Sequence, residues 1–196
     1  SRNIEIPAGW KGKHIVLFLE RTRPSTVWID GQEVGKNNYL STSQESDLTH
    51  FLTPGSHKLT IRIDNGKSIP QQIRSSSHAC TESTQTNWNG IIGRIELQAM
   101  NPLFIESIQT FPSVADRSVK VKITLSKTSG IDGKQLCLSA FAFNSSKKHK
   151  VKSTVYALKE GCKEYEFVYQ LGSKALLWSD LQPALYQLKA EINDVD

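Results

Sequence analysis

Several features that mark common classes of protein are scarce in this sequence. The 196 residues include three cysteines, Cys80, Cys137 and Cys162, and no CxxC pair, so neither a disulfide framework nor a structural zinc site is expected. No apolar run approaches the ~20 residues of a membrane-spanning helix. The five histidines are scattered without the spacing of metal ligands. We therefore expect no metal, no cofactor and no membrane span.

The cysteines leave alternatives open. Cys137 and Cys162 fall in the same half of the chain, where they either face each other or, as the sequence favours, pack separately as small buried apolar side chains. Cys80 lies close to His78, but nothing in the sequence orients this histidine as a general base.

The sequence also lacks an excess of acidic residues. It has 24 lysines and arginines and 19 acidic residues, which give a formal net charge of +5. The basic residues are spread along the chain, and their only dense run lies at residues 147–152. This run follows an Asn-Ser-Ser turn and alternates as the solvent face of a strand does. No recognition motif accompanies the charge, so no nucleic-acid partner is expected.

Helix signals are nearly absent, whereas strand signals run through the whole chain. Residues 58–64 and 118–126 alternate apolar and polar side chains with period two, and turn dipeptides such as Asp30–Gly31 separate such segments. The fold class is therefore all-β. Further strands are expected at residues 14–19, 25–29, 33–35, 91–97, 104–111, 135–144, 150–158 and 165–169, with one helical turn at 47–52 capped by Asp47.

A short connector at residues 100–103 divides the chain into two predicted domains, residues 1–101 and 102–196. The second domain has turns at intervals of about 8–12 residues, a spacing typical of an immunoglobulin-like β-sandwich. The N-terminus carries no basic-then-apolar signal pattern and reads as that of a mature or truncated product.

Five segments carry a resemblance to one enzyme family, and they occur in the family's order. Each is weak alone, because Trp and Gly are common at turns, but together they span nearly the whole chain. The chain resembles glycoside hydrolase family 2, which includes β-galactosidases, β-glucuronidases and β-mannosidases. The segments are Ile6–Pro7 with residues 10–13 (WKGK), residues 25–31 (STVWIDG), 47–49 (DLT), 88–94 (WNGIIGR) and 177–188 (LWSDLQPALYQL).

The resemblance implies a fold. Residues 1–101 would form a jelly-roll, galactose-binding-like β-sandwich that is N-terminally incomplete, because the family's opening strands have no counterpart here. Residues 102–196 would form the immunoglobulin-like β-sandwich. The family's (β/α)8 barrel with its two catalytic glutamates would begin where this chain stops, at Asp196.

The resemblance also implies a role without catalysis. Retaining glycoside hydrolysis needs two carboxylates roughly 5 Å apart, and neither Glu82 nor Glu96 belongs to such a pair by any spacing argument. No catalytic residue is therefore expected in this chain. The expected partners are the catalytic barrel of the same polypeptide and, through the parent enzyme, an oligo- or polysaccharide. A bacterial periplasmic or extracellular location is expected.

The tryptophans are the candidate sugar-contacting residues. Trp88 lies between Asn87 and Asn89 in a polar loop, and an aromatic face beside amides is typical of sugar recognition. By resemblance, Asn87, Trp88 and Asn89 are candidate substrate contacts, although Trp88 has an alternative role as an anchor of the loop. Trp28 and Trp178 are each predicted to lie in a core or, for Trp178, at a domain seam.

Two other functions stay open. The chain is alternatively a stand-alone carbohydrate-binding module or an all-β interaction protein. A module needs an open aromatic platform, whereas a scaffold needs an exposed apolar patch where a catalytic domain docks.

Overall fold

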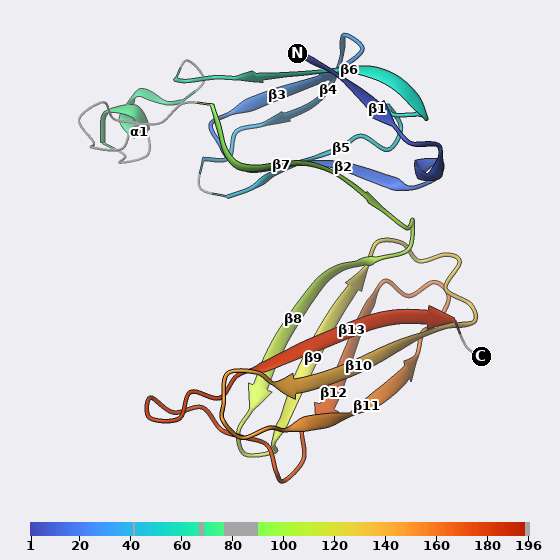
Figure 1. Ribbon diagram of the computed structural model, residues 1–196, viewed down its shortest axis with the longest axis vertical. Coiled ribbons are helices and arrows are strands. Elements are labelled where there is room, and N and C mark those ends of the chain that lie inside the picture. Colours follow the sequence, from blue (N-terminus) through green and yellow to red (C-terminus); the bar gives the residue numbers. More distant parts are fainter. Residues whose placement is uncertain (41, 67–68, 77–89, 195–196) are drawn as a thin grey trace. The chain divides into compact units, whose positions relative to one another are not determined.

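A computed structural model describes residues 1–40, 42–66, 69–76 and 90–194 (Figure 1). The described residues form thirteen strands and little helix, so the predicted all-β class is confirmed. Contacts between residues divide the chain into two compact units, Ser1–Asn101 and Pro102–Asp196. Each unit contains two antiparallel sheets.

The first unit combines a four-stranded and a three-stranded sheet. A 3-10 helix, η1 (Ala8–Trp10), and a short helix, α1 (Gln71–Ser76), complete its described part. The larger sheet has the order β1 (Arg2–Ile6), β6 (Gly55–Ile63), β3 (Ser25–Ile29) and β4 (Gln32–Asn37), and the smaller has the order β5 (Gln44–Asp47), β2 (His14–Thr22) and β7 (Ile91–Met100).

Side-chain alternation along the strands places the core of the first unit. Ile15, Leu17 and Leu19 on β2 are buried, as are Val27 and Ile29 on β3. These side chains belong to one apolar cluster between the two sheets. The inward-facing residues of both strands therefore follow a period of two, although the adjacent Val16 and Thr26 are also buried.

The prediction that Trp28 lies in this core is wrong. Consecutive side chains of a strand point to opposite faces, so burial of Val27 and Ile29 sends Trp28 to the outer face of the sheet. There it is half-buried, with the guanidinium carbon of Arg62 5.4 Å from the ring centroid. Arg62 also donates a hydrogen bond to the Thr26 hydroxyl at 3.2 Å.

Strand β5 was missed by sequence reasoning because its inward-facing side chains are polar. Gln44 is buried, and its amide nitrogen donates to the carbonyl oxygens of Tyr39, at 2.7 Å, and Arg23, at 3.2 Å. Its amide oxygen accepts from the Ser25 hydroxyl at 2.5 Å. A buried amide with its hydrogen bonds satisfied is tolerated in a core, but it breaks the apolar alternation that identifies a strand.

The predicted turn after β5 is confirmed. The Asp47 carboxylate accepts a hydrogen bond from the Thr49 amide at 2.9 Å, and the Leu52 amide donates to the Leu48 carbonyl at 3.1 Å. These contacts form one helical turn closed by a side-chain cap.

The second unit is built from two three-stranded sheets. Its core includes Tyr169, Ile123 and Leu138, all fully buried. The two described cysteines, Cys137 and Cys162, are free and partly exposed, so the prediction that both thiols are buried is wrong. The sheets have the orders β11 (Lys150–Ala157), β10 (Lys134–Ala142), β13 (Tyr186–Asp194) and β12 (Glu164–Gln170), β9 (Ser118–Leu125), β8 (Ile105–Ser113).

A bulge in the pairing of β2 with β7 is stabilised by Glu20. The register shifts between Leu19 and Arg21, and the Glu20 carboxylate accepts hydrogen bonds from the Arg94 backbone amide at 2.9 Å and from its guanidinium Nε at 3.0 Å. The backbone of Gly93 passes under this carboxylate with φ at +80°. The bond from the Arg94 amide holds the pKa of Glu20 below its usual value.

We predict that Gly93→Ala destabilises the first unit by about 1–3 kcal/mol. The new Cβ would lie 2.7 Å from the Glu20 carboxylate, in a backbone conformation that side chains rarely adopt. Urea unfolding measures the loss. Gly9→Ala is the matched control, because its Cβ would meet nothing within 4 Å and its φ lies outside the left-handed region. Equal stability of both variants would contradict the prediction.

The hairpin turn between β3 and β4 is tied to the start of β6 by His57. Its Nδ1 lies 2.6 Å from the Asp30 carboxylate and its Nε2 2.8 Å from the Thr53 carbonyl oxygen, while the Thr53 amide is farther from Nε2, at 3.3 Å. Two acceptors at the two ring nitrogens favour the doubly protonated imidazolium. The hydrogen bond with Asp30 raises the pKa of His57, and Glu5 on β1 adds to this effect.

We predict that the first unit loses stability as the pH rises from about 6.5 through the folded-state pKa of His57. The folded-state pKa of His57 lies above its unfolded value of about 6.5, so its stabilisation is fully present below that value and disappears as the pH passes the folded-state pKa. Urea midpoints at several pH values measure this. His57→Gln should flatten the pH dependence, whereas His50→Gln, in the exposed turn before β6, should keep it. An unchanged slope in His57→Gln would refute the proposal.

Candidate functional site

The proposed substrate contacts Asn87, Trp88 and Asn89 lie outside the described residues, as do His78, Cys80 and Glu82. These sequence predictions therefore stay predictions. Of the two glutamates weighed as catalytic, Glu96 is described. It lies on β7, and its carboxylate accepts a hydrogen bond from the Gln98 side-chain Nε2 at 3.1 Å and is 3.8 Å from the Arg94 guanidinium, as expected for a strand-surface carboxylate.

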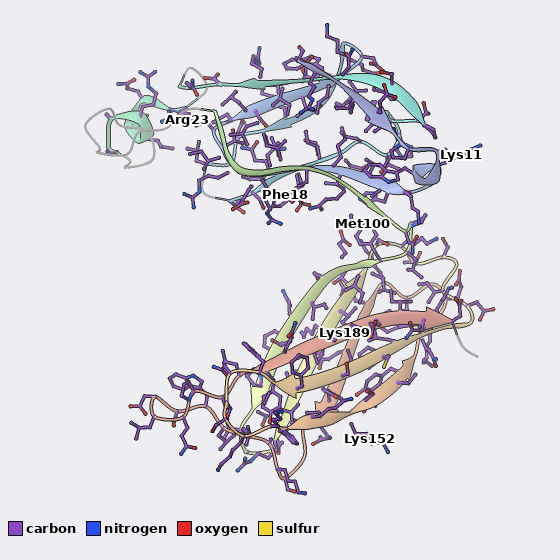
Figure 2. All side chains as sticks on the ribbon, viewed as in Figure 1. Lys11, Phe18, Arg23, Met100, Lys152 and Lys189 are labelled. Atoms are coloured by element: carbon purple, nitrogen blue, oxygen red, sulfur yellow. The ribbon has the colours of Figure 1, made fainter. Side chains whose placement is uncertain are left out.

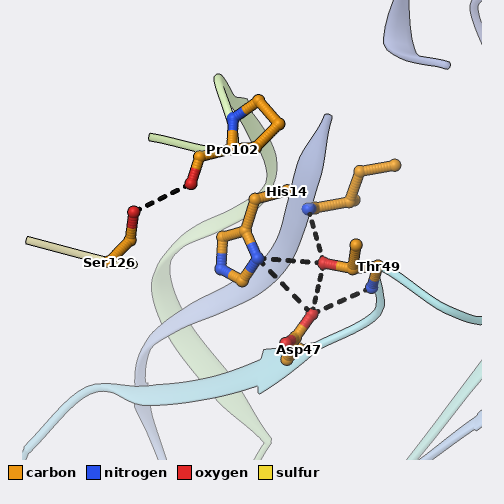
Figure 3. A network of polar contacts seen from close by, with 6 residues as sticks. His14, Asp47, Thr49, Pro102 and Ser126 are labelled. Carbon is orange, nitrogen blue, oxygen red and sulfur yellow. Dashed lines mark hydrogen bonds and ion pairs between the residues drawn. The ribbon is translucent and has the colours of Figure 1, made fainter. Parts of the chain in front are cut away.

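A cluster of His14, Asp47 and Thr49 contains the residue types of a catalytic triad, but its hydrogen bonding excludes that role (Figure 3). The Thr49 hydroxyl donates its only proton to the Asp47 carboxylate at 2.5 Å. Its oxygen accepts from the Ile15 amide at 3.1 Å, which leaves His14 Nδ1, 3.0 Å away, as a second donor. The histidine thus cannot act as the base for this hydroxyl. The cluster instead joins the start of β2 to the end of β5.

A backbone nest in the second unit is filled by the chain itself. The Glu160 carboxylate accepts hydrogen bonds from the amides of Gly130 at 3.0 Å, Ile131 at 2.8 Å and Asp132 at 3.1 Å. Successive amides of this kind form an anion-binding concavity, and the bonds from Ile131 and Gly130 lower the pKa of Glu160. The nest is therefore a structural contact rather than a ligand site.

Neither a metal-ligand cluster nor a membrane-spanning helix occurs in the described part of the chain. There, no group of three or more His, Cys, Asp and Glu side chains is placed to hold a metal ion. None of the helices in the same residues has the length and apolar character to cross a membrane.

One end of the second unit is hollow. A cavity of about 410 Å³ opens between the β8–β9 turn and the connection from β12 to β13, the orange-red loop at the left of this unit in Figure 1. Most of its lining is apolar, including Pro112, Val114, Leu177 and Leu185. Arg117 also lines the cavity, and its guanidinium donates a hydrogen bond to the Ala175 carbonyl oxygen at 2.8 Å.

The rim of this cavity exposes large apolar side chains. Val114 is 64% exposed and Trp178 is 62% exposed, while Leu177 and Leu185 are each a little under half exposed. The predicted burial of Trp178 in the second sandwich is therefore wrong. A group of exposed apolar side chains around a hollow is typical of an interaction surface. Figure 2 shows the side chains of this unit projecting from both sheets and from this end.

Tyr186 fixes the connection that carries Trp178. Its hydroxyl accepts a hydrogen bond from the Leu176 amide at 2.9 Å and lies 2.5 Å from His149 Nδ1. The two rings meet edge to face, with centroids 5.7 Å apart. The segment leading to Trp178 is thus held to β13 and to the β10–β11 turn. Sequence reasoning missed this site because the exposure of Trp178 depends on the path of the connection.

Comparison with known sequences finds relatives among glycosidases. No protein-family model matches the chain. A β-galactosidase from Oenococcus oeni is 23% identical over 202 residues, covering 98% of this chain and 19% of the relative. A putative β-glucuronidase from Formosa agariphila is 26% identical over 174 residues, covering 87% of this chain and 15% of the relative. The chain thus spans less than a fifth of the length of these relatives.

Solved structures share the fold over nearly the whole chain. A Bacteroides uniformis β-glucuronidase has a TM-score of 0.69 at 20% identity, covering 98% of this chain and 24% of its own. A glycosyl hydrolase family 2 member from Bacteroides cellulosilyticus has a TM-score of 0.67 at 22% identity, covering 100% and 26%. In sequence and in fold, this chain is similar to a part of the glycosidases of glycoside hydrolase family 2.

Proposed function

We propose that this chain is the non-catalytic N-terminal portion of a family 2 glycoside hydrolase. In this role it supports the catalytic barrel of the same polypeptide and lends a loop to carbohydrate recognition. The parent reaction is the hydrolysis of an O-glycosidic bond. Asn87, Trp88 and Asn89 stay the candidate residues of the loop. The observation that carries the proposal is the apolar rim at the end of the second unit.

The rim has the properties of a docking surface for a further domain. Exposed Val114 and the half-exposed Leu177 and Leu185 surround a largely apolar cavity. Burying the exposed part of such side chains stabilises a contact by about 1 kcal/mol each. The relatives indicate which domain docks on this surface. They are glycosidases more than five times as long as the segment they share with this chain, so a catalytic domain is the expected occupant.

Three of the described glutamates make contacts that suit a scaffold rather than a catalyst. Glu20 is engaged by Arg94, and Glu160 fills its backbone nest. Glu166 lies between the ammonium groups of Lys120 and Lys122, at 3.5 and 3.4 Å. Glycoside hydrolysis needs a carboxylate pair of which one member is held protonated, whereas these three carboxyl groups have lowered pKa values.

The length of the natural gene product tests the proposal directly. We predict an intact mass several-fold above the 21.9 kDa of this chain. A mass near 21.9 kDa would overturn the scaffold role, because no catalytic domain would then be present to dock. The measurement is mass spectrometry of the protein isolated from its source.

We predict that Val114→Asp weakens docking of the catalytic domain in the natural product. A carboxylate buried without a partner costs about 3–5 kcal/mol, so the melting temperature of the full protein should fall by several degrees. Leu181→Asp is the matched control, because Leu181 is 88% exposed and does not line the apolar cavity. In the isolated 196-residue chain, both variants should have the melting temperature of the unsubstituted chain. A full protein indifferent to Val114→Asp would place the docking surface elsewhere.

A further inference from the structure

Two adjoining hollows lie beside Trp178, next to the apolar cavity. They have volumes of about 460 and 240 Å³ and share Ser145, Lys147 and Gln182 in their linings. The larger is also lined by Trp178, whose side chain is 62% exposed. The hollows lie where the β10–β11 turn meets the β12–β13 connection, and the Leu185 amide joins these segments by donating to the Asn144 side-chain oxygen at 2.6 Å.

The lining is rich in hydrogen-bond donors. Ser145 and Ser179 each accept one backbone amide, from Lys147 at 3.2 Å and from Gln182 at 3.0 Å, so both hydroxyl protons can still be donated. The oxygen of Asn144 is occupied by Leu185, and its NH₂ group can still donate. Within the described residues, no hydrogen bond or ion pair engages the Gln182 side-chain amide or the Lys147 ammonium.

Charge selects an acidic ligand. Lys147 lines both hollows, and Lys148 follows it in the same turn. Asp180, in the neighbouring connection, lines neither hollow, and its carboxylate accepts a hydrogen bond from the Leu181 amide at 3.0 Å. The donors therefore face little competing negative charge from this connection. A ligand with a carboxylate and several oxygen acceptors matches this donor excess.

We infer that Trp178, Lys147 and Gln182 form a binding site for an acidic saccharide. The exposed indole offers an apolar face to the C–H side of a sugar ring, the amide and hydroxyls pair with ring substituents, and Lys147 pairs with the carboxylate. The inference goes beyond the proposed function, because the site lies on this chain and binds the saccharide without another domain.

Titration of the 196-residue chain tests the site. The probes are trigalacturonic acid, neutral cellotriose and a triglutamate peptide, followed by calorimetry and by tryptophan fluorescence. Trigalacturonic acid should bind saturably with a Kd of about 1 mM or tighter, and added salt should weaken it. Cellotriose should bind more weakly, and triglutamate should show no saturable binding. Triglutamate binding as tight as trigalacturonic acid would overturn the saccharide assignment.

Variants locate the binding on the proposed residues. Trp178→Ala should remove saturable binding, whereas Tyr39→Ala, which removes a similarly exposed aromatic ring at 61% in the first unit, should not. Lys147→Gln should weaken trigalacturonic acid binding at least about tenfold, as expected for the loss of a charge-assisted hydrogen bond. Lys11→Gln has the same net charge and should change it less than about twofold.

Two further results would overturn the inference. The first is no binding of any probe by the folded chain, and the second is unchanged binding in both Trp178→Ala and Lys147→Gln. The mass of the natural gene product does not enter this test. Failure of the saccharide site and failure of the scaffold role are therefore distinguishable.

Discussion

The alternation of side chains along each strand is the constraint on which this structure depends. A strand that buries Val27 and Ile29 must present Trp28 on its other face, and a strand that buries Ile15, Leu17 and Leu19 must present Phe18 outward. Phe18 then contacts the Arg94 guanidinium, whose carbon lies 4.9 Å from the ring centroid. Each unit forms its core between two sheets by this rule. The choice of buried residues therefore also fixes which side chains lie on the outer faces of the sheets.

A second rule applies to the polar groups of the loops. Their hydrogen-bond donors are paired with acceptors from other segments of the same chain. Glu160 takes up three backbone amides, Asp30 accepts from the Lys58 amide and from His57, and Thr49 joins Asp47 to the Ile15 amide. Each of these contacts ties two segments that are distant in the sequence. The anion nest and the triad-like cluster are thereby used for structure, which separates them from sites that are available to a ligand.

The end of the second unit differs from these closed loops. Its apolar cavity is open, its rim exposes Val114 and Trp178, and the neighbouring hollows contain a lysine and an amide without partners among the described residues. Apolar rim and donor-rich hollows meet at Trp178, which lines both. The scaffold role rests on Val114, Leu177 and Leu185, and the saccharide site rests on Lys147 and Gln182, while Trp178 belongs to both surfaces.

Period-two alternation and turn dipeptides in the sequence by themselves determined the all-β class and most of the strands. The ordered motifs pointed to family 2 glycosidases, in agreement with the relatives and the fold. Strand β5 was not predicted from the sequence, because its inward-facing residues, Gln44 and Ser46, are polar. Gln44 is accommodated through hydrogen bonds with distant segments. Burial of Trp28 was misjudged because its buried neighbours occupy the opposite face of the strand. Only the tertiary structure decided that Trp178 is exposed beside Lys147 and Gln182, since that depends on two connections meeting in space.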